Sequence, residues 1–457
     1  MPFYLPEAGS VPSLPLVGHA LAMSQDPLAL LLRLQREHGD VAPLRLVSLR
    51  GSLVSHPDLI DQVLRLKAKH YTRATRVYEV MARFLGRGIL TSEGEHWRKH
   101  RRIVQPAFHK QRLQSFASAM VRIGARHLDA LDGVVDARTV MMRLTLEIVS
   151  ETLLGVRTDH EAEVIARAVE DAQRHTEAAI AGLALPPSVP TPANLRFKRA
   201  VAQMDRFAYD LIEAKRREPG DDVLTMLVEA KYEDGQALSE KQIRDELLTL
   251  MAAGHETTAN ALVWTLRLLS EHPDSMRRLR AEVDEVLGGA APSFEILPKL
   301  TYTRWVIDES LRLYPPAWTT GRVVTEAHEL GSQRTARYPM ARGQFVLLSP
   351  WVTHRRPDLW PNPEGFDPER WRDLDKPGAL HPFAFFPFGG GPRKCVGEAF
   401  AYLEATIILS MIAQRLELDL VPGHPIVPSP QITLGQKHGL RMRVRRRANP
   451  LADQTST

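Results

Sequence analysis

Cys395 is the only cysteine in the chain, and its surroundings favour a chemically active thiol. It lies in the run Phe-Gly-Gly-Gly-Pro-Arg-Lys-Cys-Val-Gly, residues 388–397. Arg393 and Lys394 precede it, and apolar residues at helical spacing follow it, so the thiol should lie at the start of a helix. Cations and a helix N-terminus both favour the thiolate, which is either a nucleophile or a metal ligand.

Two other roles for this cysteine stand beside metal ligation. A lone cysteine can be an inert apolar residue. A nucleophile would need a histidine to accept its proton, and none lies between His381 and His424, although a distant one could fold in. The flanking glycines indicate instead that the backbone approaches something closely. A flat, bulky cofactor resting on the loop would require that approach.

A long helix is the second feature that carries chemistry. Ser239 and Gln242 form a capping box, and the apolar pattern then continues to Leu269 and ends before Pro273. The run Ala-Gly-His-Glu-Thr-Thr, residues 253–258, interrupts this apolar helix. The polar run is either structural, a kink or a pocket whose polar groups are hydrogen-bonded within the protein, or functional, a notch that holds a small ligand and a proton relay.

The loop pattern Phe-x-x-Gly-x-Arg-x-Cys-x-Gly resembles the heme-binding loop of the cytochrome P-450 family. The resemblance implies that Cys395 ligates the iron of heme b. The run at 253–258 is similar to the family motif that lies over the iron. By that resemblance Thr257 bonds the iron-bound oxygen, Glu256 connects it to solvent, and Ala253 and Gly254 leave room for the oxygen.

Heme carries two propionates, which need cations or donors inside a protein. Trp97 and Arg101 share one helix face. Taken alone, this pair is typical of a cation that packs on a surface helix. In the family, Trp-x-x-x-Arg binds a propionate, as does the arginine two residues before the cysteine, here Arg393. Arg322 is similar to a further propionate-binding arginine, and His96 is a weaker candidate.

Glu309 and Arg312 are three residues apart, a spacing that taken alone is typical of a surface ion pair. Together with Arg370 in the run Pro-Glu-Arg-Trp they resemble the family's buried network of three residues. Trp371 stands where the family pattern usually has phenylalanine, a departure that we expect to affect packing more than chemistry.

The resemblance implies a mainly α fold, a large helical prism with a small β-sheet region, although length alone suggests two or three domains. We expect one cytochrome P-450 domain over residues 1–447, with a proline-rich extended start at 1–20 and a disordered tail at 448–457. Short strands are expected at 41–49, 52–55 and 344–348, and irregular coil at 350–382. The proline-rich loop Leu185–Pro192 is a connector or an access lid.

The net charge of +5 comes without a nucleic-acid motif, and one cysteine allows no internal disulfide. No signal peptide is visible and no segment reaches the ~20 apolar residues that span a bilayer. These features predict a cytoplasmic monomer without a membrane anchor or nucleic-acid partner.

The resemblance implies an iron-containing oxidoreductase, a monooxygenase that hydroxylates or epoxidises an apolar substrate. Fatty acid, terpenoid, steroid and polyketide-like molecules all fit. The chain has no flavin or nicotinamide fingerprint, so electrons should come from a ferredoxin or flavodoxin-type donor with its reductase. An acidic ferredoxin could dock near Arg98, Lys99, Arg102 and Lys394.

Two rival functions stay open at this point. Some family members use or rearrange peroxides, but those commonly lack the acid–alcohol pair, present here as Glu256-Thr257. A heme-based gas sensor or carrier is the non-catalytic alternative, although no added signalling or DNA-binding segment is visible.

Overall fold

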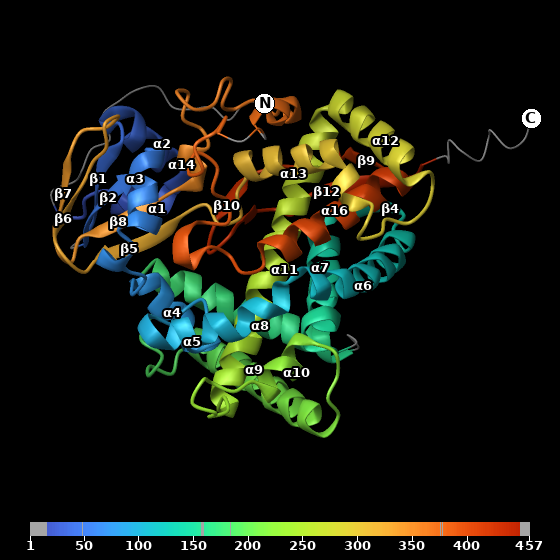
Figure 1. Ribbon diagram of the computed structural model, residues 1–457, viewed down its shortest axis with the longest axis horizontal. Helices are drawn as coiled ribbons and strands as arrows, with labels where there is room; N and C mark the ends of the chain where they lie inside the picture. The colour runs from blue at the N-terminus through green and yellow to red at the C-terminus, as the bar shows by residue number, and fades with distance from the viewer. Residues whose placement is uncertain are drawn as a thin grey trace, which may run out of the picture. The chain divides into compact units, whose positions relative to one another are not determined.

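The computed structural model describes residues 16–47, 49–156, 160–182, 184–374, 376 and 378–447 (Figure 1). The expected extended start lies outside the described residues up to residue 15, and the expected tail at 448–457 lies outside them entirely. The predicted mainly α fold with small sheets is confirmed. Among the described helices, none combines the length and apolarity that crossing a membrane requires.

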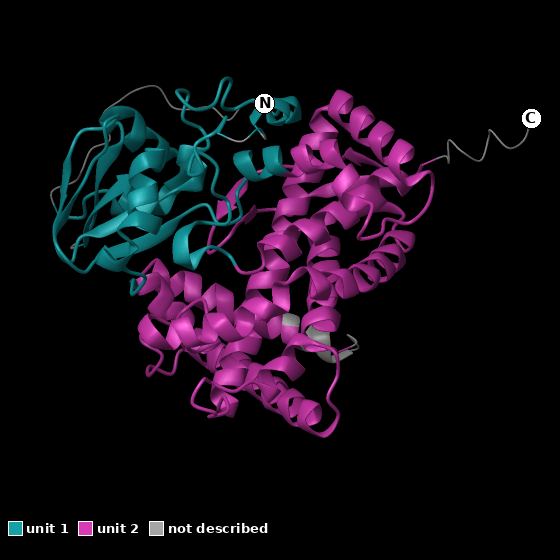
Figure 2. Ribbon diagram, in the orientation of Figure 1, with its two compact units in different colours: residues 1–75, 308–395 teal, residues 76–307, 396–457 magenta. Residues whose placement is uncertain are grey.

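The chain divides into two compact units, which Figure 2 colours separately. Unit 1 comprises residues 1–75 and 308–395, and unit 2 comprises residues 76–307 and 396–457. Cys395 is therefore the last residue of unit 1, and the helix that follows it belongs to unit 2.

Unit 1 is built around a sheet of strand order β1-β2-β8-β5-β3, in which β2 and β8 are parallel and the other pairs antiparallel. The register places Leu53 opposite Leu347 and Val54 opposite Leu348, which aligns two apolar runs. The elements of unit 1 are α1 (Ala20–Gln25), α2 (Pro27–His38), β1 (Val41–Leu46), β2 (Leu49–Val54), α3 (Pro57–Asp61), a π-helical turn (Gln62–Leu66), a 3-10 turn (Ala68–His70), β3 (Tyr71–Thr72), β5 (Thr320–Val324), β6 (His328–Leu330), β7 (Tyr338–Met340), β8 (Phe345–Leu348), α14 (Pro350–Thr353) and α15 (Trp371–Leu374).

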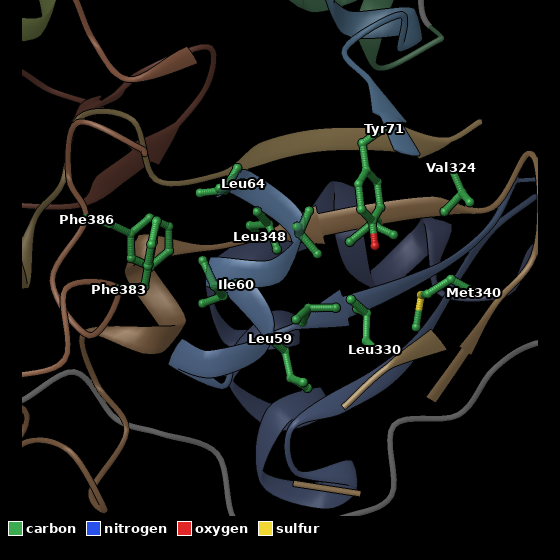
Figure 3. Packing of buried hydrophobic residues seen from close by; sticks show 13 residues of the cluster. Leu59, Ile60, Leu64, Tyr71, Val324, Leu330, Met340, Leu348, Phe383 and Phe386 are labelled. Carbon is green, nitrogen blue, oxygen red and sulfur yellow. The ribbon is translucent and has the colours of Figure 1, made fainter. Parts of the chain in front are cut away.

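The core of unit 1 joins this sheet to the chain that leads to Cys395. Leu64 of the π-helical turn belongs to the same buried cluster as Leu348 of β8 and Phe383 and Phe386 of the loop before the cysteine (Figure 3). Each fully buried side chain of this size contributes about 1.5–3 kcal/mol. The hydrophobic effect therefore fixes the start of the cysteine loop on the sheet.

Unit 2 is mostly helical, with two small sheets, β4-β12-β9 and β10-β11. Its elements are α4 (Arg76–Leu85), α5 (Gly94–Val104), α6 (Lys110–Asp129), β4 (Gly133–Asp136), α7 (Ala137–Leu154), α8 (His160–Ile180), α9 (Pro192–Arg217), α10 (Val223–Glu229), α11 (Glu240–Glu271), α12 (Pro273–Leu287), the greater part of α13 (Thr301–Leu313), α16 (Glu398–Arg415), β9 (Leu416–Leu420), β10 (Pro428–Pro430), β11 (Leu434–Gln436) and β12 (Arg441–Arg446).

The predicted long helix is α11, a helix of 32 residues. Both bonds of the capping box between Ser239 and Gln242 form, and Pro273 opens α12, as expected. Figure 1 shows α11 running among the other helices of unit 2, and it packs against α7, α9 and α16. Because neighbours cover most of its circumference, its buried residues include polar ones, which must find partners inside the protein.

The segments 350–382 and 185–192 are the two that the sequence predicts as coil and loop. The region expected as coil at 350–382 contains only short helical turns. The loop Leu185–Pro192 is tied down by one buried side chain, since the Asn194 amide donates to the carbonyls of Pro186 and Val189 at 2.8 Å each. Its role as a lid stays a prediction.

Candidate active site

Cys395 ends a loop whose backbone is fixed by its own hydrogen bonds. The backbone N–H of Cys395 donates to the Phe388 carbonyl at 3.0 Å, and that of Lys394 donates to the Gly391 carbonyl at 3.1 Å. Gly389 and Gly391 have φ of 69° and 64°, the left-handed region that glycine adopts without strain. The loop leaves the Cys395 side chain exposed.

The glycines of this loop differ in whether a side chain would fit at their positions. A Cβ atom at Gly391 would lie 1.8 Å from the Leu64 carbonyl oxygen, whereas one at Gly389 would meet nothing within 4 Å. At Gly390 a Cβ would lie 2.2 Å from the Phe383 ring. The loop thus lies directly on the π-helical turn and on the core of unit 1, and two of its three glycines are required by contact.

Glu309 is the centre of a buried ion network in unit 1. Its side chain and that of Arg312 are fully buried, and Arg312 binds it through Nη2–Oε1 at 2.8 Å and Nε–Oε2 at 2.9 Å. Arg370 Nε also donates to Oε1, at 3.0 Å. The three residues predicted to form a network therefore do so, and the surface ion pair that the spacing alone suggests is excluded.

Trp371 adds a bond that the sequence comparison did not foresee. Its indole Nε1–H donates to Glu309 Oε2 at 3.0 Å. Phenylalanine has no donor to offer at this position. The departure from phenylalanine therefore adds a hydrogen bond to the buried Glu309 carboxylate, and its effect on the reaction stays a prediction.

Arg312 extends the network into the irregular coil. Its Nη1 donates to the carbonyls of His354 and Pro363, and its Nη2 also donates to that of Gly365, at 2.7–2.9 Å. All five guanidinium N–H groups are thus engaged. The coil from 354 to 371 is held by this one side chain more than by regular structure.

His354 links that coil to the cysteine loop. It is fully buried, and its Nε2 accepts the Phe386 N–H at 3.0 Å while Nδ1 faces the Arg312 carbonyl at 3.3 Å. Burial lowers the pKa of His354 well below its ordinary value, and the Arg312 charge adds to this. A neutral imidazole with its proton on Nδ1 fits both contacts.

The candidate propionate ligands of unit 1 lie on two elements. Arg322 is on β5, largely buried, and donates from Nη1 to Thr320 Oγ1 at 2.9 Å and to the Gly321 carbonyl at 2.8 Å. Arg393 closes the 3-10 turn Gly391–Arg393, two residues before Cys395, and is half-buried.

The candidate propionate ligands of unit 2 lie on α5. Trp97 and Arg101 are half-buried, and Arg101 Nε donates to Gln105 Oε1 at 3.2 Å. His96 Nε2 lies 3.0 Å from the Arg87 carbonyl, and its ring is 4.1 Å from that of His100. His96 is therefore already engaged with protein groups, which makes it the weakest of the five candidates.

The polar run of α11 is the accessible part of an otherwise buried helix. Ala253 is exposed and Glu256 and Thr257 are half-buried, while the Thr257 hydroxyl donates to the Ala253 carbonyl at 2.8 Å. His255 is buried and bonds the Met251 carbonyl at 2.8 Å, a structural role as expected. A Cβ at Gly254 would lie 3.0 Å from the Val149 side chain of α7, so helix packing also favours a small residue here. That Gly254 leaves room for oxygen stays a prediction.

Sequence reasoning missed the partners that hold these α11 groups. Thr433 and Gln173 donate to the two carboxylate oxygens of Glu256, each at 2.7 Å. Further along α11, the fully buried Glu246 binds His100 Nδ1 at 2.5 Å and accepts the Ile89 N–H at 3.1 Å. A charged residue inside an apolar helical pattern was the available signal, but a pattern does not name partners 83 to 177 residues away.

The donor set fits heme. An exposed thiol on a loop of glycines suits a flat group that carries an iron atom. Arg322 and Arg393 of unit 1 and Arg101 of unit 2 are cations, the type of residue that propionates require. The exposed methyl side chain of Ala253 leaves α11 approachable at its polar run.

We predict that Gly391→Ala destabilises unit 1 far more than Gly389→Ala. Both substitutions place a side chain at positive φ, which costs about 1–2 kcal/mol, but only the first collides with the Leu64 carbonyl. Urea unfolding of the two variants measures the difference. Equal losses of stability would contradict the loop contact.

We predict that Trp371→Phe lowers the free energy of unfolding by about 1.5–3 kcal/mol, the range for a hydrogen bond to a charged group. Trp360→Phe is the matched control, because Trp360 is equally buried but its Nε1 has no partner among the described residues. Chemical denaturation of both variants is the measurement. If Trp360→Phe lowers the free energy of unfolding as much as Trp371→Phe does, the hydrogen bond of the Trp371 indole N–H is not the cause of the loss.

The chain matches known proteins over most of its length. The family model for cytochrome P-450 matches residues 9–440. The chain is 39% identical to cyclooctatin synthase of Streptomyces melanosporofaciens, covering 92% of each protein. It is 37% identical to cyclooctat-9-en-7-ol 5-monooxygenase of the same organism, covering 91% of this chain and 90% of the relative.

Two further proteins extend the comparison. Pentalenene oxygenase of Streptomyces avermitilis is 33% identical, with 96% of this chain and 97% of the relative covered. The crystal structure of the heme domain of cytochrome P-450DA matches with a TM-score of 0.87 at 26% identity, covering 96% of this chain and 98% of that one. The match over nearly the whole length, together with the thiol loop and the buried Glu309 network, identifies the chain as a member of the cytochrome P-450 family, a heme b monooxygenase that acts on apolar substrates.

Proposed function

We propose that this protein inserts one oxygen atom of dioxygen into a cyclic terpenoid, and that the Cys395 thiolate would ligate the heme iron. The exposed thiol of the chain's one cysteine, on a loop held by the Leu64 contact, is the observation that carries the ligand assignment. The names of two relatives, which give cyclooctat-9-en-7-ol and pentalenene as the molecules oxygenated, support the substrate class.

The propionates of heme would be bound by Trp97 and Arg101 of α5, by Arg322 of β5 and by Arg393. Arg101 and Arg393 are half-buried, so their charges are less screened than those of surface arginines. His96 takes a lesser part, because its Nε2 already faces the Arg87 carbonyl.

Heme with a thiolate ligand supplies the electron density that favours cleavage of the O–O bond. The residues of α11 would supply protons for that cleavage. Glu256 holds or releases a proton at its carboxylate, and the Thr257 hydroxyl directs it when it turns away from the Ala253 carbonyl that it now donates to. Ala253 leaves space beside these groups because it has only a methyl side chain.

We predict that reduced wild-type protein under carbon monoxide shows the red-shifted Soret band of thiolate ligation and that Cys395→Ser lacks it. The serine oxygen is a poorer donor to iron than a thiolate. Absorption spectra at matched heme content make the comparison. A variant that keeps the band would refute the ligand assignment.

The same preparation tests the substrate class. Cyclic terpenoid hydrocarbons and alcohols should shift the Soret band and be converted to oxygenated products at the expense of NADPH when surrogate redox partners are added. A fatty acid series of similar apolar area is the control. Stronger binding and turnover of the fatty acids would reject the terpenoid proposal, and heme binding without any product would favour the gas sensor or carrier.

Electrons would come from an acidic ferredoxin or a flavodoxin-type protein with its reductase. Arg98, Lys99 and Arg102 are exposed on α5, which also carries Trp97 and Arg101. Lys99 and Arg102 already pair with Glu95 and Glu233, so part of their charge is compensated. Lys394 of unit 1 is exposed as well.

We predict that replacing Arg98, Lys99 and Arg102 by glutamine slows reduction by ferredoxin on the order of tenfold at low salt, and much less at high salt, where charges are screened. The control replaces the exposed Arg196, Lys198 and Arg199 of α9, which removes the same charge elsewhere. Stopped-flow reduction is the measurement. Equal slowing in both triple variants would show that only net charge matters.

The single domain over 1–447, the cytoplasmic location and the monomeric state stay predictions. Size-exclusion chromatography of the heme-loaded protein tests the last of these.

A further inference from the structure

The carboxyl groups of Glu177 and Glu256 in unit 2 are connected through the same two segments, α8 and the loop between β10 and β11. On α8, Gln173 donates to Glu256 Oε2, and Glu177 follows Gln173 by one helical turn. On the loop between β10 and β11, the Thr433 hydroxyl donates to Glu256 Oε1 and the N–H of the preceding Ile432 donates to Glu177. Adjacent residues of one loop therefore donate to the two carboxyls, while α8 supplies a donor to Glu256 and, one turn later, carries Glu177 itself.

The bonds of Glu256 have a fixed direction. The Asn260 amide, fully buried, donates to Thr433 Oγ1 at 3.0 Å, so the threonine accepts from asparagine and turns its own proton to Glu256. Gln173 also offers an N–H. Neither donor carries a charge, so they orient the carboxylate without neutralising it. The proton that Glu256 passes on therefore has to come from a group other than these two donors.

Glu177 has the protonation behaviour that a donor needs. Burial, with a smaller contribution from the charge of Glu256, raises its pKa to about 7. The Ile432 N–H and the charges of Arg174 on α8 and Arg138 on α7 act in the opposite direction and are weaker. The residue is half-buried and so still reaches solvent, from which it can regain a proton.

The other neighbours of Glu256 do not offer a proton at neutral pH. Gln173 and Thr433 do not titrate in this range. The His255 ring is fully buried with Nδ1 on the Met251 carbonyl, and burial lowers its pKa, so it is neutral. Of these groups, Glu177 alone combines a removable proton with access to water.

We propose that Glu177 delivers the protons that Glu256 passes on during oxygen cleavage, an inference that rests on the proposed role of Glu256. In the step, the O–H bond of the Glu177 carboxyl breaks and an O–H bond forms on Glu256. The negative charge moves from Glu256 to Glu177, and solvent then reprotonates Glu177. Glu177 acts through Glu256 and does not itself touch the reacting atoms.

The test compares Glu177→Gln, Glu177→Asp and Glu256→Gln in the heme-loaded enzyme, with Glu213→Gln on the exposed face of α9 as the control. Because the protonated form is the donor, product formed per NADPH consumed should fall in wild type as pH rises through about 7. Glu177→Gln should form product roughly a hundredfold more slowly at neutral pH and lose this inflection, at the lower end of the range for one proton-transfer group. Glu177→Asp should keep it, and Glu213→Gln should match wild type.

Infrared difference spectra give a readout independent of turnover. A protonated-carboxyl band should disappear from wild type as pH rises through about 7 and be missing in Glu177→Gln. If Glu256→Gln slows product formation while Glu177→Gln keeps the wild-type rate and inflection, the Glu177 proposal is overturned alone. If Glu256→Gln also has no effect, the relay through Glu256 itself fails and Glu177 has no recipient. A titrating band that persists in Glu177→Gln belongs to another carboxyl and overturns the assignment.

Discussion

The buried carboxylate of Glu309 is the constraint on which unit 1 depends. It accepts bonds from two arginines, from the Trp371 indole and from the Asp367 N–H, all inside the protein. A carboxylate taken out of water without partners costs several kcal/mol, and removing one partner of a buried pair typically costs about 3–5 kcal/mol. The chain between 354 and 371 has little regular structure, so these bonds are what give it one conformation.

That conformation reaches Cys395 through a short series of contacts. Arg312 bonds the His354 carbonyl, His354 accepts the Phe386 N–H, and Phe386 lies in the same apolar core as Leu64. The Leu64 carbonyl in turn faces Gly391 of the cysteine loop. Charge pairing, a neutral imidazole and hydrophobic packing therefore fix the loop together.

Helix α11 is regular, unlike the coil of unit 1, but it carries a run of polar residues inside an otherwise apolar element. Two carboxylates of α11 have partners from distant segments: His100 for Glu246, and Thr433 with Gln173 for Glu256. The hydroxyls of Thr257 and Thr258 also donate to the carbonyls of Ala253 and Gly254, one turn earlier. Glu256 differs from Glu246 in that the side chains that donate to it, Thr433 and Gln173, are both uncharged.

Local chemistry in the sequence determined the thiol loop, the capping box of α11, its end before Pro273 and the Glu309–Arg312 spacing, because each depends on neighbours a few residues apart. It did not determine that Trp371 donates to Glu309, that Gly254 packs against Val149 of α7, or that adjacent residues of one loop donate to Glu177 and Glu256. Those facts depend on which distant segments meet. Only the tertiary structure decides this, because burial and hydrogen-bond pairing act through space, and a residue pattern records that a polar group needs a partner without recording which one it finds.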